Sequence, residues 1–432
     1  MSTGTSLVVL FVACSWAPEP EPVVPPVPPA PVVEPDLGKW FETRTHAHDP
    51  GLSEAQRAEI EQLEALGYAD GTDPGHGATG VTVHDRQATS GGFNFFASGH
   101  GPEAVLVDMD GRELHRWHHE FWDAFADYPV KRSDGSTHNF RRARLLSDGS
   151  VLAIHEGLGM IRIDAESRLL WAFAGRPHHD LEVHGDRIYT LTREVHLVDG
   201  FRGDRPTVED FVSVLDVTTG RELQRVSLLA AVRGHETHRR MLDTVPPKKG
   251  DVFHSNSVHL LDGDVGAGRV MVSMRTTSAV VVVDLNTGQL EWAQQGPWRA
   301  QHDARVQEDG NLWLFDNRGL GKRRSRVLRV GWPETDELWS WAGPEASTLN
   351  SGTLGSVDLL ADGHVLVTES ERGRAVELDP DTGAVVWEFH NPHQAGPNGQ
   401  FVAALFELVR LGPDFDVSWA RGTSTPPRAA DP

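Results

Sequence analysis

The sequence predicts an all-β protein, a six-bladed β-propeller with a short N-terminal helical extension. The chain of 432 residues is long enough to form one large repeat architecture. Its 13 Trp and 43 Gly favour strands joined by tight turns. From about residue 80 onward, short strands alternate with turn signals every 8 to 12 residues, which is typical of all-β folds.

The charge balance argues against two classes of partner. The chain has 40 Lys and Arg against 62 Asp and Glu, a formal net charge of -22. A surface this acidic repels phosphate backbones and anionic lipids, so we expect no nucleic-acid partner and no electrostatic binding to membranes. The sequence also contains no P-loop and no dinucleotide fingerprint.

Residues 1–14 resemble a bacterial lipoprotein signal, in which the cysteine becomes the lipidated first residue. An apolar run from Leu7 to Ala13 precedes Cys14, the single cysteine of the chain. The resemblance implies an exported protein, lipid-anchored in the periplasm or outer membrane. No Lys or Arg precedes the run, and Phe11 stands where Leu is usual. The alternative is a short secretory signal, or a misassigned start, with an incidental cysteine.

Residues 15–50 are expected to form a tether. The stretch 16–36 alternates Pro with Val and Glu, and proline lacks a backbone donor and fixes φ. An extended polyproline II segment of this length reaches roughly 60 Å at about 3.1 Å per residue. We therefore expect it to hold a globular body away from a membrane anchor.

The helical extension occupies residues 51–78. A helix is predicted over Leu52 to Tyr68, with Ser53 as its N-cap and Gly67 at its end. Apolar residues recur at helical spacing at Ile60, Leu63 and Leu66. The simplest interpretation is that this stripe packs on the outside of the main body, and a partner-binding helix is the alternative.

Residues 79–412 are predicted to form the propeller. Each unit has a strand, an Asp-Gly turn, two further strands with their turns, and a last strand closing on an apolar residue. The Asp-Gly turns begin at Asp110, Asp148, Asp262, Asp309 and Asp362. The closing residues are Trp117, Trp171, Leu223, Trp292, Trp341 and Trp387. Their intervals are 54, 52, 69, 49 and 46 residues, and periods near 50 made of four strands indicate propeller blades.

Two segments depart from this period. The longest interval contains an insertion near Val232 to Asp251. The strand-like segment Phe401 to Leu411 follows the sixth closing, and we expect it to pair with an edge of an end blade and lock the ring. Residues 413–432 are expected to form a polar C-terminal tail.

Polar residues recur where successive inner strands begin. His302 lies seven residues before Asp309, His254 lies eight before Asp262, and His179 precedes a similar, shortened turn. Because inner strands line the channel of a propeller, these histidines are expected at about the same height on its wall. Side chains two apart on a strand share a face, so Asn256 is expected to point inward with His254.

Arg275 ends the second strand of the blade that His254 opens. Its flanks are strongly apolar, and a buried arginine is costly unless an anion or a carboxylate satisfies it. A single histidine at a blade start is more often structural, but three in adjacent blades beside an Asn and an Arg favour a functional cluster. Four further histidines are interpreted as surface or packing residues; they are His138, His155, His364 and His390.

Several motifs resemble the bacterial aryl-sulfate sulfotransferase family. They are HHD at residues 178–180, then FHSNSV, SMRTTSAV, QHDARVQEDGNLWLFDN and GSVDLLADGHVLVTES, in family order. The resemblance covers roughly residues 80 to 411 and is most specific in its middle third. It implies a six-bladed propeller, in agreement with the count of closing residues.

The resemblance also implies a mechanism. Family members move a sulfuryl group from an aryl sulfate to a phenol through a sulfohistidine, without a nucleotide cofactor. By motif position His302 is the nucleophile, with His179, His254, Asn256 and Arg275 around the sulfate. The sequence does not decide which of His179 and His254 is the general acid and base. The family's large N-terminal domain and paired cysteines are absent, which leaves oligomeric state and substrate access open.

Two rival hypotheses stay open. Three histidines could bind zinc with an open fourth site and make a hydrolase, although Arg275 beside a metal is unfavourable. A lipoprotein without catalytic activity could instead bind a ligand or a protein at the channel mouth, since propellers host many functions.

Overall fold

The computed structural model describes residues 49–422 together with Met1 and His46, apart from gaps at 65–70, 72, 75–76, 131–134, 247, 263–267, 322–323, 345–346 and 397. The chain divides into two compact units, Met1–Asp36 and Leu37–Pro432, and the following concerns the second. The predicted signal with Cys14 and the Pro-rich stretch 16–36 lie outside the described residues.

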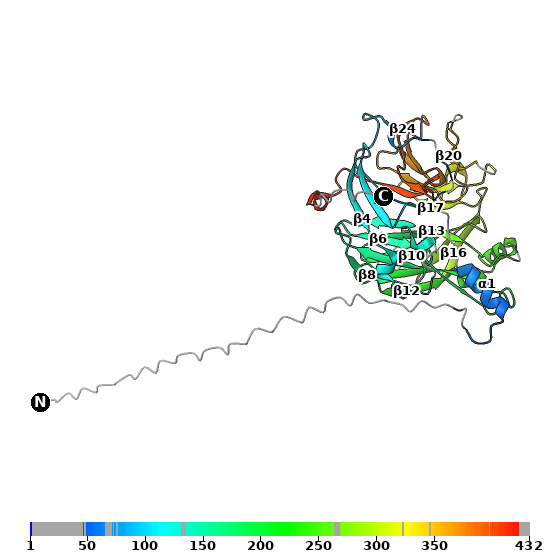
Figure 1. The fold of residues 1–432 in the computed structure, drawn as a ribbon. Coiled ribbons are helices and arrows are strands. Elements are labelled where there is room, and N and C mark those ends of the chain that lie inside the picture. The colour runs from blue at the N-terminus through cyan, green and yellow to red at the C-terminus, as the bar shows by residue number, and fades with distance from the viewer. Residues whose placement is uncertain are drawn as a thin grey trace. The chain divides into compact units, whose positions relative to one another are not determined.

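Six antiparallel sheets form the blades of a β-propeller (Figure 1). From the inner to the outer edge their strands are β27 (Leu405–Leu411), β2 (Phe93–Ser98), β3 (Glu103–Asp108) and β4 (Glu113–His118) in blade 1; β5 (Arg142–Leu145), β6 (Val151–His155), β7 (Gly159–Ile163) and β8 (Leu169–Phe173) in blade 2; β9 (Pro177–His184), β10 (Arg187–His196), β11 (Thr207–Asp216) and β12 (Glu222–Ser227) in blade 3; β13 (Ser255–Asp262), β14 (Arg269–Met274), β15 (Ala279–Asp284) and β16 (Gln289–Gln295) in blade 4; β17 (His302–Val306), β18 (Leu312–Asp316), β19 (Arg326–Val330) and β20 (Glu337–Trp341) in blade 5; and β21 (Ser356–Leu359), β22 (Val365–Glu369), β23 (Arg374–Leu378) and β24 (Val385–His390) in blade 6. All six predicted closing residues lie in the fourth strands, so the predicted fold class is confirmed.

Strands from both ends of the propeller close the ring. β27 pairs antiparallel with β2 and becomes the inner strand of blade 1, as expected for a tail that pairs with an end blade. β1 (Gly80–His84) pairs with β24 and adds a fifth strand to blade 6. Because the chain's end supplies the inner strand of blade 1, the turn at Asp110 precedes β4 and does not follow an inner strand. The prediction that grouped Asp110 with the first turns was therefore wrong.

Helix α1 (Glu54–Glu64) packs on blade 3. Its N-terminus is a capping box, in which the Gln56 backbone N–H donates to Ser53 Oγ and the Ser53 N–H donates to the Gln56 side chain. Ile60 is fully buried against Val195 and Val208, as predicted for the apolar stripe. Leu66 and Gly67, predicted to end the helix, lie outside the described residues.

The remaining helical and strand elements are short. They are α2 (Phe121–Ala124), α3 (Leu228–Gly234), the 3-10 turns η2 (Gly135–Thr137), η3 (His238–Thr244), η5 (Ser370–Arg372) and η6 (Ser418–Gly422), and a hairpin of β25 (Gln394–Ala395) and β26 (Phe401–Val402). In the part of the chain that the structure describes, no helix is long and apolar enough to cross a lipid bilayer. The turn η6 packs against blade 1, where the Trp419 and Trp117 rings lie 5.4 Å apart.

Apolar layers between neighbouring blades hold the ring together. Between blades 3 and 4, for example, Tyr189, Val212, Val258 and Val281 are all fully buried in one cluster. This packing uses the faces of the sheets and leaves the start of each inner strand free to carry polar residues. The histidines singled out in the sequence lie there.

Candidate active site

The predicted site residues gather at the mouth where the inner strands of blades 3, 4 and 5 begin. His179 lies near the start of β9, His254 and Asn256 flank the start of β13, and His302 opens β17. Arg275 directly follows β14, and its backbone N–H donates to the His254 carbonyl at 3.3 Å. The His179 and His254 ring centroids are 5.1 Å apart.

The backbone at this mouth departs from regular strand geometry. His179, His254 and Asp303 have φ values of 60°, 51° and 52°, in the left-handed region. Register shifts occur at the same points of β9, β13 and β17, and one of them surrounds Asn256. The alternation argument that placed His254 and Asn256 on one face therefore does not apply. Bulges redirect side chains, and backbone strain of this kind clusters at functional sites.

His302 is held in one tautomer by Asn317. The Asn317 Nδ2 donates to the carbonyls of Ser351 and Leu354, at 2.8 and 2.6 Å, so its Oδ1 must be the acceptor. His302 Nδ1 lies 2.7 Å from that oxygen and consequently carries the proton. The lone pair is on Nε2, which accepts the Leu354 backbone N–H at 3.3 Å. The lone pair that could attack thus sits on the ring nitrogen that Asn317 does not hold, where it accepts the Leu354 N–H.

The electrostatic surroundings keep His302 neutral. The residue is 3% exposed, and burial lowers the pKa of its imidazole well below the ordinary 6.5. The hydrogen bond to Asn317 opposes this change, while the positive charges of Arg275 and His254 lower the pKa further. A neutral imidazole is the form that can act as a nucleophile.

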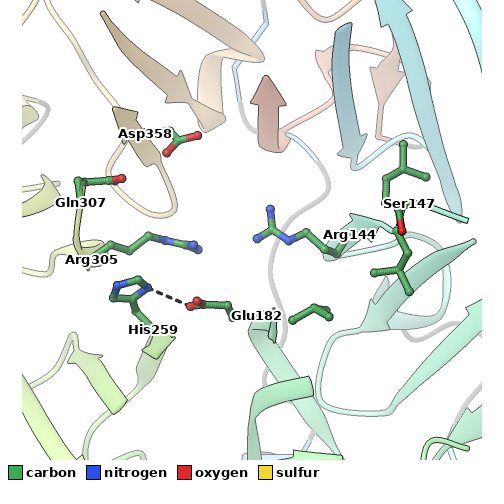
Figure 2. Close-up of a pocket in the computed structure, with 10 residues that line it drawn as sticks. Arg144, Ser147, Glu182, His259, Arg305, Gln307 and Asp358 are labelled. Atoms are coloured by element: carbon green, nitrogen blue, oxygen red, sulfur yellow. Dashed lines mark hydrogen bonds and ion pairs between the residues drawn. The ribbon is translucent and has the colours of Figure 1, made fainter. Parts of the chain in front are cut away.

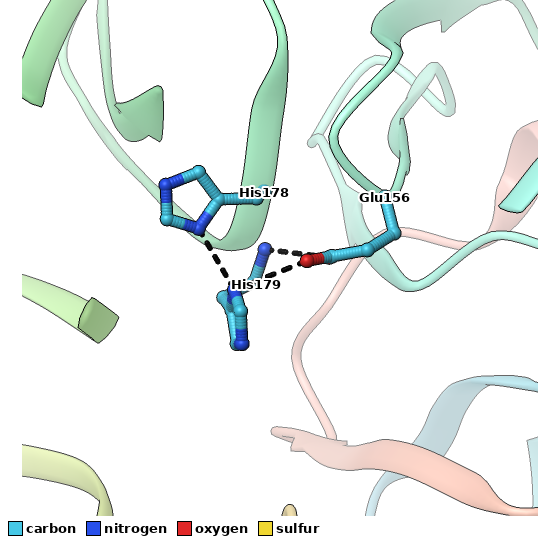
Figure 3. Close-up of side chains that lie close together, drawn as sticks. All are labelled: Glu156, His178 and His179. Atoms are coloured by element: carbon cyan, nitrogen blue, oxygen red, sulfur yellow. Dashed lines mark hydrogen bonds and ion pairs between the residues drawn. The ribbon is translucent and has the colours of Figure 1, made fainter. Parts of the chain in front are cut away.

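His179 belongs to a buried group with His178 and Glu156 (Figure 3). The two Nδ1 atoms of the histidines are 2.8 Å apart, and Glu156 accepts the His179 backbone N–H at 2.9 Å. Burial lowers the pKa of both histidines well below 6.5, and positive charge on neighbouring residues lowers it further. His179 is therefore neutral and poorly suited to carry a proton to a leaving group.

His254 differs from the other two because a carboxylate holds it. Its Nδ1 is hydrogen-bonded to Asp251, which also accepts the His254 backbone N–H at 3.0 Å. Burial raises the pKa of Asp251, but the charge and hydrogen bond of His254 outweigh burial and bring it to about 2. Burial, followed by the charge of Asp251, raises the pKa of Asp210 behind it to about 7. The His254 side chain is 19% exposed, whereas the His179 side chain is 2% exposed.

Arg275 and Asn256 each have a buried polar atom without a hydrogen-bond partner among the described residues. The Arg275 Nε is buried and has no hydrogen-bond partner among the described residues, where Arg275 also forms no salt bridge. Asn256 donates one N–H to the Gln301 carbonyl at 2.8 Å, and its buried Oδ1 lacks a protein partner in the described part of the chain. Gln301 is itself fixed by bonds to Ser273 and to the carbonyls of Met274 and Ala279.

The metal hypothesis named the wrong three ligands. Among the described residues, two groups bring their ligand atoms within 4.8 Å of one another, Asp362 with His364 and Glu377 elsewhere in the propeller, and Glu156 with His178 and His179 at this mouth. Neither group includes His254 or His302. Two nitrogens on tetrahedral zinc stand about 3.3 Å apart at Zn–N distances near 2.0–2.1 Å, so the 2.8 Å pair must open before it could bind one. The Arg141 guanidinium already lies 4.0 Å from Glu156. These residues fit a hydrogen-bonded support better than a zinc site.

The sequence did not identify the residues that hold the histidines. Asn317, Asp251, Glu156 and Arg141 come from other segments, and Arg141 is 4% exposed beside the site. Only Asp251 gave a local signal, since it stands three residues before His254. Asn317 reaches His302 when β17 and β18 pair, and Arg141 and Glu156 come from the neighbouring blade 2.

A different cavity opens at the other end of the channel, where the inner strands finish (Figure 2). Its volume is about 370 Å³, and its polar lining residues are Arg144, Ser147, Glu182, His259, Arg305, Gln307 and Asp358. An ion network separates it from the histidines. In this network Asp180 binds Arg142 at 3.1 Å and Arg305 at 3.3 Å, and Arg142 also binds Glu407 at 2.5 Å. None of the five predicted residues lines this cavity.

The buried neutral histidines predict acid sensitivity. His155 packs between Phe121 and Phe140, with centroid distances of 5.0 and 5.3 Å, and burial lowers its pKa to about 3. Below about pH 6.5 the imidazole of His155 binds a proton in the unfolded chain but stays neutral in the folded chain. The free energy of unfolding therefore falls as the pH falls. Each such histidine contributes up to about 1.4 kcal/mol per pH unit between its two pKa values. In urea unfolding between pH 7 and 4.5, His155→Phe should make this slope shallower by about one proton; an unchanged slope would contradict the assignment.

Comparison with known proteins gives one family. The family model described as arylsulfotransferase (ASST) matches residues 142–392. A search of curated protein sequences found no match. Among solved structures, a protein of unknown function from Bacteroides caccae is 14% identical, with 74% of this chain and 98% of that chain covered and a TM-score of 0.44. A streptogramin B lyase is 13% identical (80% and 97% covered, TM-score 0.42), and AztD from Citrobacter koseri is 12% identical (76% and 100%, TM-score 0.40).

Proposed function

Because the chain belongs to the arylsulfotransferase family, we propose that it transfers a sulfuryl group from an aryl sulfate to a phenol through a sulfohistidine on His302, without a nucleotide cofactor. The observation that carries this mechanism is the state of His302. It is a buried neutral imidazole whose Nδ1 proton is held by Asn317 and whose Nε2 lone pair lies in the field of Arg275.

In the first half-reaction, His302 Nε2 attacks sulfur and the bond between sulfur and the aryl oxygen breaks. Sulfuryl transfer resembles phosphoryl transfer, which needs positioning and positive potential more than covalent chemistry by the protein. Arg275 offers a rigid set of donors to the sulfuryl oxygens, and the second N–H of Asn256 adds another. The Leu354 N–H, which loses its acceptor when Nε2 bonds to sulfur, can donate to one of these oxygens.

Asn317 has a chemical role as well as a positional one. As a neutral amide it cannot take the Nδ1 proton, so the sulfated ring keeps that proton and its positive charge. When the bond to sulfur breaks, this cationic ring departs as a neutral imidazole, a good leaving group, which favours passing the sulfuryl group on. In the second half-reaction a phenol oxygen attacks sulfur and the bond to His302 Nε2 breaks.

We assign the general acid and base role to His254. It gives its Nε2 proton to the departing phenolate and takes one from the acceptor phenol on return. Support comes from its pairing with Asp251 and its partial exposure, whereas burial lowers the pKa of His179 well below 6.5. His179 then acts as a neutral support for the wall of the site.

The function is tested by its dependence on an acceptor. Purified protein with 4-nitrophenyl sulfate should release nitrophenolate in many turnovers only when phenol is present. Release at the same rate without phenol would indicate hydrolysis. If no turnover occurs with any phenol and no sulfated protein forms, the transferase function is lost and a binding role at this mouth stands in its place. Metal analysis of the same sample tests for zinc.

The role of His254 predicts a dependence on the leaving group. General acid catalysis contributes roughly 10²- to 10⁴-fold when the leaving oxygen is basic. His254→Ala should therefore slow sulfation of the enzyme strongly with phenyl sulfate, whose phenol has a pKa of about 10. The loss should be much smaller with 4-nitrophenyl sulfate, whose phenol leaves without protonation. Equal losses for both donors would assign the proton transfer to another group.

We also propose that the protein is exported and anchored by a lipid on Cys14, its only contact with the membrane. This rests on the sequence of residues 1–14 alone. Expressed in a bacterium that processes lipoproteins, the wild type should incorporate labelled palmitate, and Cys14→Ser should not. Label retained by the variant would refute the anchor.

A further inference from the structure

The cavity at the end of the channel opposite the histidines is built by five of the six blades. The inner strands β5, β9, β13, β17 and β21 end at it, and their side chains enclose about 370 Å³ (Figure 2). This volume lies within the roughly 300–1,000 Å³ that is usual for small-molecule sites. The ion network around Asp180 separates the cavity from the histidines, so sulfuryl transfer makes no use of it.

Several charged groups in the wall of this cavity are paired within the protein. The Nε of Arg305 lies 2.8 Å from Asp303, and its Nη2 lies 3.3 Å from Asp180. Glu182 lies 3.0 Å from the Nδ1 of His259 and accepts a backbone N–H of β13 at 3.2 Å. These contacts fix the wall and use the hydrogen-bonding groups that make them.

Two lining groups of opposite charge, Asp358 and Arg144, are exceptions. The Asp358 carboxylate forms no hydrogen bond and no salt bridge with any residue that the structure describes. The Arg144 guanidinium forms no hydrogen bond in the same part of the chain, and its one ion pair there is a long contact of 3.5 Å to Glu407. Glu407 lies closer to Arg142, at 2.5 Å. Because Arg144 and Asp358 do not pair with each other either, both can bind a ligand.

The placement of Arg144 and Asp358 suits a ligand held between them. Figure 2 shows Arg144 entering the cavity from blade 2 and Asp358 entering it from blade 6. Both residues are half-buried, so water solvates their charges incompletely. Burial raises the pKa of Asp358 to about 6, against the opposing charge of Arg305, and the carboxylate is therefore mostly ionised at neutral pH. Charges in such surroundings are costly unless a partner satisfies them.

Opposite charges at separate points of one cavity match a zwitterion. A simple anion would leave Asp358 without a partner, and a simple amine would leave Arg144 without one. A metal ion fits less well, because no group of three metal-ligating side chains among the described residues includes a residue that lines this cavity.

The rest of the lining indicates the class of zwitterion. Leu145, Leu146 and Val183 bring apolar side chains to the same space. We propose that this cavity binds a small α-amino acid with an apolar side chain, its carboxylate on Arg144 and its ammonium group on Asp358. A guanidinium presents a planar fork of donors to a carboxylate, and a carboxylate accepts the charged hydrogen bonds of an ammonium group.

Three ligands with the same carbon skeleton test the two charged contacts. L-leucine has both charges, 4-methylpentanoate lacks the ammonium group, and 3-methylbutylamine lacks the carboxylate. In calorimetry with the full chain at neutral pH, L-leucine should bind at least about tenfold more tightly than either analogue, because each analogue loses one charged hydrogen bond. Equal affinities for the three, or no binding of L-leucine at millimolar concentrations, would refute the proposal.

Substitutions at the two charged residues assign each contact. Asp358→Asn should weaken binding of L-leucine about tenfold or more and leave 4-methylpentanoate unchanged. Arg144→Met should also weaken L-leucine, but it should not weaken 3-methylbutylamine. The matched control is Asp336→Asn, an exposed position between β19 and β20, which should change no affinity. If L-leucine binds both cavity variants as it binds the wild type, its site lies elsewhere and the assignment is wrong. The comparison of ligands on the wild type does not depend on the folding of any variant.

This site is independent of the proposed transferase function. Since the ion network lies between the cavity and the histidines, His302→Ala should bind L-leucine with the affinity of the wild type. Binding of L-leucine by a protein that transfers no sulfuryl group would leave the amino-acid site standing. A large loss of L-leucine binding in His302→Ala would instead place the amino acid at the histidine mouth and overturn the proposal.

Discussion

His302→Ala should abolish transfer, with kcat reduced on the order of 10⁴-fold or more, because the sulfuryl group then has no nitrogen to bond to. The same change leaves the Oδ1 of Asn317 without its donor, at about 1–3 kcal/mol of stability. His302→Gln, whose amide can still donate to Asn317, should be equally inactive and better folded. Rates with 4-nitrophenyl sulfate and phenol, together with thermal unfolding, measure both effects.

The matched control is His259→Ala. His259 lies at the opposite mouth, bonded to Glu182 at 3.0 Å, and should leave the transfer rate within a fewfold of the wild type. Substantial activity in both His302 variants would show that another residue accepts the sulfuryl group. Inactivity of the His259 variant would show instead that any disturbance of the channel is enough to abolish transfer.

Arg275→Met should have the second largest effect, a loss of about 10²- to 10³-fold in kcat/KM. That is the typical magnitude when one preorganised donor to developing negative charge is removed. Arg275→Lys should recover only part of the loss, because an ammonium keeps the charge but not the planar fork. The Nε of Arg275 is buried without a hydrogen-bond partner among the described residues, so the substitution removes no hydrogen bond at that atom and should cost little stability.

Arg269→Met is the control for Arg275. Arg269 lies at the other end of β14, exposed and 3.7 Å from Glu291, where a surface ion pair contributes about 0–1 kcal/mol. It should leave kcat/KM unchanged. An Arg275→Met enzyme with normal kinetics would mean that the sulfuryl oxygens are bound elsewhere.

The fold was predictable because its signals are local and repeated. Each fourth strand contains one apolar closing residue, of which Trp171 and Trp387 are almost fully buried, and six of them give six blades. The misplaced turn at Asp110 has a physical reason: the first blade takes its inner strand from β27, at the far end of the chain. The segment Phe401 to Leu411 was expected to pair with an end blade, but no local pattern indicates that it supplies the inner strand.

The site was only partly predictable. Counting residues back from the first turn of a blade located His179, His254 and His302. This was possible because the inner strands of these blades have similar lengths. It could not give their orientations, since register shifts and left-handed residues interrupt each inner strand. Nor could it find Asn317, which meets His302 only once β17 and β18 pair, or the choice between His179 and His254, which depends on burial.

The most direct test of the account is mass spectrometry of the protein mixed with an aryl sulfate in the absence of acceptor. We predict a gain of one SO₃ group, located on His302 by fragmentation at mildly alkaline pH and removed when phenol is added. The adduct should be absent from His302→Gln and present in the His259→Ala control. A sulfuryl group found on His179, His254 or a hydroxyl side chain, or no adduct in an enzyme that turns over, would contradict the mechanism.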